Sequence, residues 1–489
     1  MAAAFSDILD EARLSARALL DYGDNFFNPT VRLGVTGLSR AGKTVFITAL
    51  IHGLMRGGRF PIFESMASGR IARARLEPQP DDAVPRFAYE SHVRTLIEER
   101  RWPNSTVDIS ELRLVIDYQR QKGADRTLVL DIVDYPGEWL LDLPLLNKSY
   151  EQWSAESLAL SRVEPRAHLA AQWHAQLATL DPIAREDEQA TLKAAQLFTD
   201  YLRACRDERF AMSLLPPGRF LMPGNLAGSP ALTFAPLDLP EDGVAPAGSL
   251  WAMMRRRYEA YKDVVVRPFF RDHFSRLDRQ IVLVDALSAF NAGPEALHDL
   301  EAALAGILDC FRVGRSTLLS ALFRPRIDRI LFAATKADHL HHSSHDRLEA
   351  VLRRTVAKAA ARAEITGADI DVVALAAVRA TREAHVQRGR EKLPSILGTP
   401  ARGEVANGET FDGETEVATF PGDLPVNAES LFGEDNAFQG LSSASADKSD
   451  FRFLRFRPPL LASDAADGPA LPHIRLDRAL QFLIGDKLQ

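Results

Sequence analysis

The sequence GLSRAGKT occupies residues 37–44 and directly follows the apolar run VRLGVT at residues 31–36. It fits the pattern G-x-x-x-x-G-K-[ST] at every position. Small residues in this pattern let consecutive backbone N–H groups curl around a phosphate group, and the helix that follows adds its positive N-terminus. The sequence therefore predicts a buried strand over residues 31–36, a phosphate-binding loop, and a helix over residues 45–54.

The polar residues of this loop have expected roles. The Lys43 side chain is expected to reach the β- and γ-phosphate oxygens, and the Thr44 hydroxyl to bind Mg²⁺. Arg40 has two interpretations: an internal arginine finger that stabilises transition-state charge, or a side chain that points to solvent or pairs with a switch carboxylate. The residues expected to contact the phosphate groups are Ser39, Arg40, Ala41, Gly42, Lys43, Thr44 and Val45.

A second motif ends another apolar run. Residues 128–137 read LVLDIVDYPG, a strand-like segment that finishes in D-x-x-G. Downstream of a phosphate-binding loop, this pattern indicates that Asp134 holds Mg²⁺, directly or through water, and that the Gly137 N–H meets the γ-phosphate. Asp131 is the competing candidate for the metal role.

Residues beside these motifs are candidates for a nucleotide-dependent switch. Glu138 follows the D-x-x-G motif, where it is either a carboxylate that holds water or an exposed residue with no catalytic part. Thr106 lies in the polar loop before the strand expected over residues 112–118 and is the candidate for a threonine that covers Mg²⁺; Thr95 and Ser105 are the alternatives. The expected catalytic residues are Lys43, Glu138 and Thr106, and the expected metal ligands are Thr44, Thr106 and Asp134.

A third motif, TKAD at residues 335–338, follows the apolar run at residues 330–334. The Asp338 carboxylate can accept two parallel hydrogen bonds from the N1–H and amino groups of guanine, which adenine does not offer. The Lys336 stem would pack along the base, and Thr335 opens the motif. The TKAD motif therefore predicts that the protein binds guanine nucleotides, GTP or GDP, and argues against an ATPase.

The loop after the strand expected over residues 370–374 is the other candidate contact with the base. GTPases bring a backbone N–H to the guanine oxygen from this position in the fold. Ala377 and Val378 are the residues expected to supply it here.

Strands and helices alternate in both outer parts of the chain but not between them. This order predicts an α/β fold of the P-loop NTPase, GTPase type: a mostly parallel sheet with a large helical insertion and a small β-containing C-terminal region. Four units are expected. Residues 1–144 form the N-terminal part of a GTPase-like domain, and residues 145–274 form the helical insertion. Residues 275–392 form the C-terminal part of the GTPase-like domain, and residues 393–489 form a C-terminal extension with short strands and a terminal helix.

Composition limits the possible partners and location. The 489 residues are 46% hydrophobic and carry a net charge of −7, which fits a globular chain and argues against nucleic-acid binding. Cys205 and Cys310 form no metal-binding or disulfide pattern. No apolar stretch is long enough to span a bilayer and no signal sequence is evident, so a cytoplasmic setting is expected.

Three further features each have two interpretations. Residues 5–20 predict a packing helix, with a membrane-surface helix as the alternative. Residues 255–257 are three consecutive arginines on either a solvated helix face or a face for a partner or an anionic membrane, so peripheral membrane association stays open. The histidines after the base motif are expected to be solvated, with metal binding as the alternative. They are His339, His341, His342 and His345.

Together, these motifs resemble those of the YcjX-like family of bacterial P-loop GTPases. The segments that carry the resemblance are GLSRAGKT (37–44), WPNSTVDISELRL (102–114), LDIVDYPGEWLLDLPLL (130–146), TKADHL (335–340) and VRATRE (378–383). The resemblance covers nearly the whole chain. It implies GTP/GDP binding, a cytoplasmic location, a link to bacterial stress responses, and a GTPase-type domain with a large helical insertion.

Two hypotheses of function follow. The first is a GTPase that uses Mg²⁺, hydrolyses GTP slowly and repositions the helical insertion, which would carry the surface for a protein effector. The second is a nucleotide-gated interaction module with little or no hydrolysis.

Overall fold

The computed structural model describes most of the chain. The described residues are 29–38, 40–240, 243–310, 327–364, 367–388, 390–406, 408–432, 453–461 and 470–489. The helix expected over residues 5–20 and the expected phosphate contact Ser39 lie outside them.

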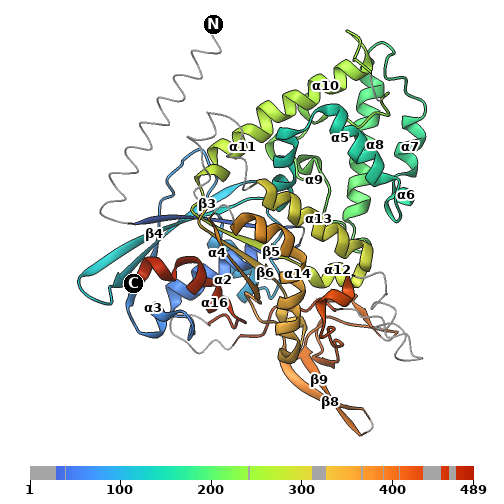
Figure 1. Ribbon diagram of the computed structural model, residues 1–489. Coiled ribbons are helices and arrows are strands. Elements are labelled where there is room, and N and C mark those ends of the chain that lie inside the picture. Colours follow the sequence, from blue (N-terminus) through green and yellow to red (C-terminus); the bar gives the residue numbers. More distant parts are fainter. Residues whose placement is uncertain are drawn as a thin grey trace.

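A seven-stranded sheet forms the centre of the molecule, in the order β2-β3-β4-β1-β5-β6-β7 (Figure 1). The five strands from β4 to β7 in this order are parallel to one another, whereas β3 is antiparallel to both β2 and β4. The mostly parallel α/β fold expected from the sequence is confirmed. The strands are β1 (Thr30–Gly37), β2 (Ile71–Glu77), β3 (Ser110–Gln119), β4 (Asp125–Asp134), β5 (Arg279–Val284), β6 (Arg329–Ala334) and β7 (Asp369–Ala374).

The sequence analysis does not predict β2. This strand lies at the edge of the sheet, paired only with β3 within the sheet. Its sequence IARARLE carries arginines at positions 73 and 75, and only Ala74 is buried. An edge strand with one solvated face needs few apolar residues, so it produces no continuous apolar run.

The sheet separates two hydrophobic cores. On β5, Ile281 and Leu283 belong to one core and Val282 and Val284 to the other, because side chains alternate across a strand. The helices α2 (Lys43–Arg56) and α16 (Leu476–Ile484) contribute to the first core. The helices α13 (Pro294–Cys310) and α14 (His345–Glu364) contribute to the second.

Helices fill the chain between β4 and β5, and the part of this segment that the structure describes contains no strand. They form the upper right of Figure 1. Their interior is aromatic: Trp153 stacks on Tyr258 with ring centroids 5.2 Å apart, and Phe234 meets Trp153 edge-on. This interior is continuous with the second core of the sheet, so the helices pack onto the α/β body.

The main elements of this helical segment begin at the glycine of the D-x-x-G motif. They are η1 (Gly137–Asn147), α5 (Tyr150–Ser161), α6 (Arg166–Leu169), α7 (Ala171–Leu177), α8 (Glu188–Arg206), α9 (Gly218–Leu221), α10 (Leu250–Tyr261), η4 (Lys262–Val266) and α11 (Arg267–Asp272). Three short turns also belong to it, namely η2 (Gly224–Leu226), η3 (Pro230–Leu232) and η5 (Phe274–Arg276). That residues 145–274 act as one inserted unit stays a prediction.

The three consecutive arginines expected on α10 are all paired. Arg255 lies 3.9 Å from Glu151, Arg256 3.6 Å from Glu186, and Arg257 2.5 Å from Glu188. Each positive charge therefore has an acidic neighbour, which reduces the net charge of this face. Within the described residues, no helix combines the length and the apolar character needed to cross a bilayer.

The C-terminal part adds a hairpin that projects below the central sheet in Figure 1. Its strands β8 (Arg382–Arg388) and β9 (Glu391–Gly398) are antiparallel, and β12 (Val417–Thr419) pairs with β9. The pair β10 (Val405–Ala406) and β11 (Glu409–Thr410) is separate. The boundary expected between residues 392 and 393 falls inside β9.

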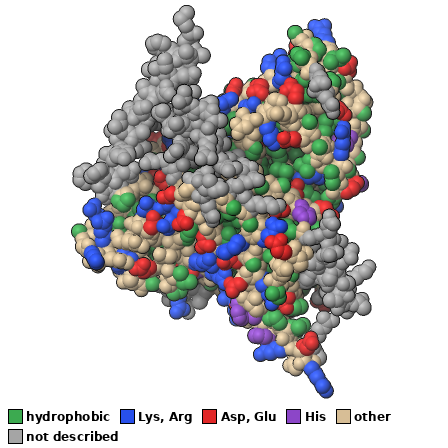
Figure 2. Space-filling view, in the orientation of Figure 1, with side chains coloured by type: hydrophobic (Ala, Val, Ile, Leu, Met, Phe, Trp, Pro, Cys, Tyr) green, Lys and Arg blue, Asp and Glu red, His purple; other side chains and the backbone are tan. Residues whose placement is uncertain are grey.

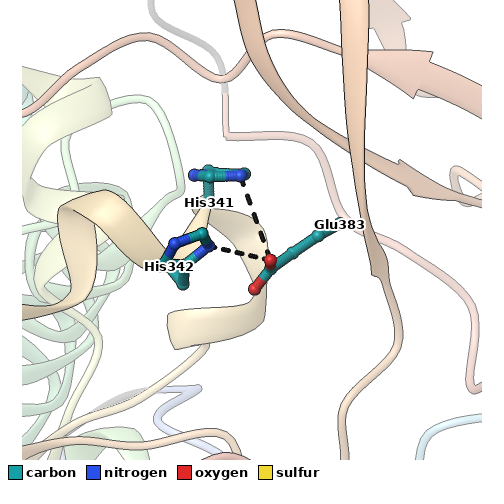
Figure 3. A group of neighbouring side chains, drawn as sticks. All are labelled: His341, His342 and Glu383. Atoms are coloured by element: carbon teal, nitrogen blue, oxygen red, sulfur yellow. Dashed lines mark hydrogen bonds and ion pairs between the residues drawn. The ribbon is translucent and has the colours of Figure 1, made fainter.

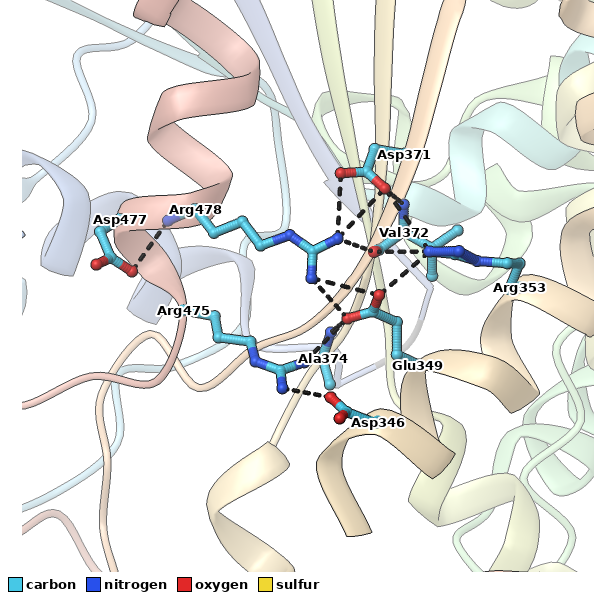
Figure 4. Close-up of polar contacts among 9 residues, drawn as sticks. All are labelled: Asp346, Glu349, Arg353, Asp371, Val372, Ala374, Arg475, Asp477 and Arg478. Carbon is cyan, nitrogen blue, oxygen red and sulfur yellow. Dashed lines mark hydrogen bonds and ion pairs between the residues drawn. The ribbon is translucent and has the colours of Figure 1, made fainter. Parts of the chain in front are cut away.

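The C-terminal helix returns to the α/β body, where arginines fix it (Figure 4). Arg478 of α16 lies 3.0 Å from Glu349 of α14 and 3.4 Å from Asp371 of β7. Arg475, the residue before α16, pairs with Glu349 at 3.0 Å and with Asp346 at 2.5 Å. These ion pairs thereby join the C-terminal helix α16 to α14, the helix that follows the TKAD motif.

Asp142 is a buried anchor between η1 and the helices that cover it. Its carboxylate accepts hydrogen bonds from the Tyr261 hydroxyl at 2.6 Å and from the Gly218 N–H at 2.6 Å. Burial raises the pKa of Asp142 to about 6, although both hydrogen bonds act in the opposite direction. The folded state therefore holds the Asp142 proton more tightly than the unfolded chain does.

This shift predicts how pH changes stability. The folded-state pKa of Asp142 lies above the unfolded value of about 3.9. The stabilisation of the folded state by the protonated Asp142 carboxyl is therefore complete below about pH 4 and is lost as pH rises through about 6. Replacement by asparagine removes the titration. We expect the free energy of unfolding of wild type, relative to Asp142→Asn, to fall by about 1–3 kcal/mol between pH 4 and pH 7. Urea unfolding at several pH values measures this difference, and parallel pH profiles of the two proteins would contradict it.

Candidate functional site

The carboxyl ends of four neighbouring strands bring the sequence motifs together. In the register of the sheet, Val35 of β1 lies beside Asp134 of β4, Gly37 beside Leu283 of β5, and Val284 beside Ala334 of β6. Each motif begins at or directly after one of these strand ends. Ligands bind at this edge in open α/β sheets.

The loop between β1 and α2 has the backbone of a phosphate-binding turn. Gly42 adopts the left-handed conformation, with φ of 81°, and caps the N-terminus of α2. The Ala41 N–H donates to the Leu38 carbonyl at 3.1 Å, which closes the turn before the helix. Lys43, Thr44 and the expected contact Val45 form the first turn of α2, so the helix N-terminus faces the loop.

Gly137 lies directly against this loop. A Cβ atom at position 137 would come within 2.1 Å of the Gly37 carbonyl oxygen, which no side chain tolerates. The D-x-x-G motif therefore needs glycine here so that the residues after β4 can approach the end of β1.

The three expected metal ligands meet in one hydrogen-bonded chain. The Thr44 and Thr106 hydroxyl oxygens lie 3.2 Å apart, and Thr106 donates to Asp134 Oδ2 at 2.6 Å. Thr44 Oγ1 also lies 3.5 Å from the Asn104 carbonyl oxygen. These groups come from the phosphate loop, the loop before β3 and the end of β4. The structure thus brings the three side chains together, and their role as metal ligands stays a prediction.

Asp134 has the electrostatic properties of a cation ligand. Its other oxygen, Oδ1, is buried with no hydrogen-bond partner among the described residues. Burial raises the pKa of Asp134, whereas the charge of Lys43 and the Thr106 hydrogen bond lower it. An unpaired buried carboxylate oxygen is costly, and a bound Mg²⁺ would remove that cost. The residues present therefore fit the ion.

The competing candidates occupy other positions. The Asp131 carboxylate binds Arg113 through both oxygens, at 2.7 Å and 2.9 Å, on neighbouring strands of the sheet. Thr95 lies within α4 (Tyr89–Ile97). Ser105 belongs to the same loop as Thr106, but it is Thr106 that contacts Thr44 and Asp134.

Glu138 is buried, and the interpretation of an exposed switch residue is wrong. Its carboxylate lies 3.2 Å from the Arg206 guanidinium, and its side chain is 6% exposed. Arg206 is the last residue of α8, so the residue after the D-x-x-G motif is bound to the end of α8. The sequence analysis misses this pair because the two residues are far apart in the sequence.

The Arg40 side chain also reaches the helical segment. Its guanidinium pairs with Glu208, two residues beyond α8. Glu208 in turn lies 3.0 Å from Arg455, which pairs with Glu404 at 2.6 Å. Arg40 thus pairs with a carboxylate, but this carboxylate lies beyond α8 and not in the segments expected to act as switches.

The TKAD motif lies just beyond β6 and is tied to its neighbours. The Lys336 ammonium group lies 2.5 Å from Asp285, which follows β5, and this contact lowers the pKa of the buried Asp285 carboxyl against the effect of burial. Thr335 donates from its backbone N–H to the Val284 carbonyl at 2.9 Å. Asp285 is a site residue that the sequence analysis overlooks, although its place at the end of the apolar run IVLVD was a usable signal.

Asp338 is buried and oriented by the loop after β7. Its Oδ2 accepts a hydrogen bond from the Ala380 N–H at 2.8 Å, and its carbonyl oxygen accepts one from the Thr381 hydroxyl at 2.5 Å. Of the expected residues in this loop, Val378 is buried in the first core and Ala377 packs against it. The contact with Asp338 thus comes from Ala380, which no residue-type pattern identifies.

This combination of fold and motif order is that of GTPase-type P-loop proteins. The chain matches the YcjX-like family, DUF463, over residues 31–488. It is 38% identical over 475 residues to the Ras-like GTPase YcjX of Escherichia coli (strain K12), and the match covers 94% of this chain and 96% of that protein. It is 34% identical over 489 residues to the Ras-like GTPase YcjX of Shewanella oneidensis, covering 94% and 95% respectively. The chain belongs to the YcjX-like family.

The contact of Gly137 with the phosphate loop predicts a sharp difference between two glycine-to-alanine substitutions. Gly137→Ala places a methyl group against the Gly37 backbone, whereas the methyl group of Gly306→Ala, inside α13, has its nearest neighbour 4.0 Å away. We expect Gly137→Ala to lower the free energy of unfolding by about 1–3 kcal/mol. Gly306→Ala should leave it unchanged or raise it by up to about 1 kcal/mol. Denaturant unfolding compares them, and equal effects would refute the close approach.

Proposed function

We propose that this protein binds GTP and GDP with Mg²⁺, hydrolyses GTP slowly, and acts as a nucleotide-dependent switch. The observation that carries the proposal is the convergence of Thr44, Thr106 and Asp134 beside Lys43, with one Asp134 oxygen that has no hydrogen-bond partner among the described residues. The names of the two relatives, both Ras-like GTPases, support it. The family resemblance further leads us to propose a bacterial stress-related process as its setting.

The residues of the phosphate site have distinct tasks in this proposal. Backbone N–H groups of the loop and the N-terminus of α2 bind the phosphate groups, and Lys43 neutralises their charge. Thr44, Thr106 and Asp134 hold Mg²⁺, which when bound neutralises charge on the phosphate oxygens. Gly137 brings its backbone N–H to the terminal phosphate because it lies against Gly37.

Guanine selectivity rests on Asp338. The Ala380 N–H and the Thr381 hydroxyl hold this residue in place, so its carboxylate is oriented before the base arrives. Lys336 is held by Asp285 and lies beside the position of the base. A pre-oriented buried carboxylate discriminates against adenine, because adenine would leave it without its hydrogen-bond donors.

Slow hydrolysis follows from the position of Glu138. Its carboxylate is engaged by Arg206, so it is not free to orient a water molecule. The Arg40 guanidinium is engaged by Glu208 in the same way. This observation also favours the second candidate function, an interaction module with little hydrolysis. A single-turnover GTP hydrolysis assay separates the two.

The switch itself involves the C-terminal end of α8. Two ion pairs join this region to the proposed nucleotide site. Arg206 pairs with Glu138 of the D-x-x-G segment, and Glu208, just beyond the helix, pairs with Arg40 of the phosphate loop. A shift of Gly137 on loss of the γ-phosphate would change the first pair and displace α8. We propose that the helical segment reports this change to a protein effector.

The base-recognition proposal predicts a change of nucleotide preference. Asp338→Asn presents one acceptor and one donor, so its donor faces the guanine amino group, whereas xanthine offers a carbonyl there. We expect wild type to prefer GDP to ADP, and Asp338→Asn to gain preference for XDP over GDP by roughly ten- to a hundredfold. Competition against a fluorescent nucleotide measures both, with Asp346→Asn as control. Equal binding of ADP and GDP by wild type would exclude guanine recognition.

The switch proposal predicts the effect of removing Arg206. Arg206→Ala leaves the buried Glu138 carboxylate without this partner and should lower stability by about 1–3 kcal/mol. The matched control is Arg203→Ala on the same helix, since Arg203 pairs with the half-exposed Asp200. Wild type and the control should show nucleotide-dependent hydrogen exchange in residues 188–206 between a GTP analogue and GDP. That difference should disappear in Arg206→Ala, and its persistence would rule out this route of coupling.

A further inference from the structure

Two histidines and a glutamate meet beside the base-recognition motif. His341 and His342 lie in the loop that joins TKAD to α14, at the start of η7 (His342–Ser344), and Glu383 lies on β8. Their ligand atoms all lie within 4.8 Å of one another. In Figure 3 both imidazole rings face the end of the glutamate side chain.

The geometry is close to that of a metal site. Glu383 Oε2 lies 2.8 Å from His342 Nδ1 and 3.9 Å from His341 Nε2. His341 is 7% exposed, and its Nε2 is buried without a hydrogen-bond partner among the described residues. Its other nitrogen, Nδ1, lies 2.9 Å from the Ser343 hydroxyl, which fixes the ring. The Ser343 backbone N–H also lies 3.4 Å from Nδ1. A metal on Nε2 requires Nδ1 to carry the ring proton and donate it to the Ser343 hydroxyl, as metal-bound histidines do through their second nitrogen.

A third histidine, His385, is a candidate for a fourth ligand. His385 follows Glu383 by two positions on β8, so both side chains stand on one face of the strand. The His385 ring centroid is 5.5 Å from that of His341. On the other side of Glu383, Arg379 lies 3.5 Å from Oε1 and leaves Oε2 to the histidines.

We propose that His341, His342 and Glu383 bind one Zn²⁺ ion, with His385 or water as the fourth ligand. Imidazole nitrogens with one carboxylate suit zinc, whereas Mg²⁺ prefers oxygen ligands and stays at the phosphate site. Small movements of the side chains bring the three ligand atoms to the spacing of a tetrahedral ion.

The ion would clamp the two segments that hold Asp338. His341 lies three residues after Asp338, and Glu383 lies two residues after Thr381, whose hydroxyl binds the Asp338 carbonyl oxygen. A role in base recognition rests on the function proposed above. The metal site itself does not, and it is tested without nucleotide.

The test uses the untagged full-length chain, stripped with a chelator and dialysed into buffer with excess Mg²⁺ to fill oxygen-ligand sites. Zn²⁺ titration followed by calorimetry should give one site per chain, and Co²⁺ should give the intense visible absorption of a tetrahedral ion. His342→Ala and Glu383→Gln alter exposed side chains and should weaken Zn²⁺ binding about tenfold or more. His341→Ala should do the same, and His168→Ala, which alters an exposed histidine of α6, should bind like wild type.

Each outcome decides the proposal. The site is supported if wild type and His168→Ala bind one Zn²⁺ with similar affinity while His342→Ala and Glu383→Gln bind it about tenfold more weakly or not at all, even if His341→Ala does not fold. Absence of Zn²⁺ binding by wild type overturns it, as does equal binding by His342→Ala, Glu383→Gln and wild type. Failure of guanine binding with intact Zn²⁺ binding would count against the proposed function alone.

Discussion

The parallel pairing of β1 with both β4 and β5 is the constraint on which the arrangement of the site depends. This pairing sets Val35 beside Asp134 and Gly37 beside Leu283, so the phosphate loop, the D-x-x-G segment and Asp285 begin at one edge. The pairing of β5 with β6 adds the TKAD motif. Because side chains alternate across these strands, the two cores hold the register from both faces.

Charged contacts connect that edge to the rest of the chain. Arg206 at the end of α8 pairs with the D-x-x-G segment, and Glu208, two residues beyond the helix, pairs with the phosphate loop. Arg455 joins the C-terminal part of the chain to Glu208. Where a pair is exposed, as in Arg40–Glu208, its contribution to stability is small. The buried Glu138 carboxylate differs, because leaving it without a partner is costly. The exposed pair therefore adds little to the folding energy, whereas the Glu138–Arg206 pair contributes to stability; in the proposed switch, both pairs link the nucleotide state to the helical segment.

The sequence predicts the strands of the central sheet well where they are buried on both faces, because their apolar runs are continuous. It predicts Thr44 and Asp134 as candidate metal ligands because their motifs need particular residue types at short spacing, and the structure places both beside Thr106 of the loop before β3. The contacts Glu138–Arg206 and Asp338–Ala380 are not predictable in this way: the first joins residues distant in sequence, and the second uses a backbone N–H. The β8–β9 hairpin escapes prediction because β8 consists mostly of polar residues and gives no apolar run, although part of β9 is buried.

We propose that the loop after β1 binds the phosphate groups of a nucleotide. The most direct test of this proposal is calorimetric titration of GDP with Mg²⁺ into wild type and Lys43→Ala, after circular dichroism has shown that both are folded. Loss of the charge-assisted contact of Lys43, about 1.5–3 kcal/mol, predicts one site in wild type and an affinity about ten- to a hundredfold weaker in the variant. Wild-type affinity in a folded Lys43→Ala protein would contradict the account.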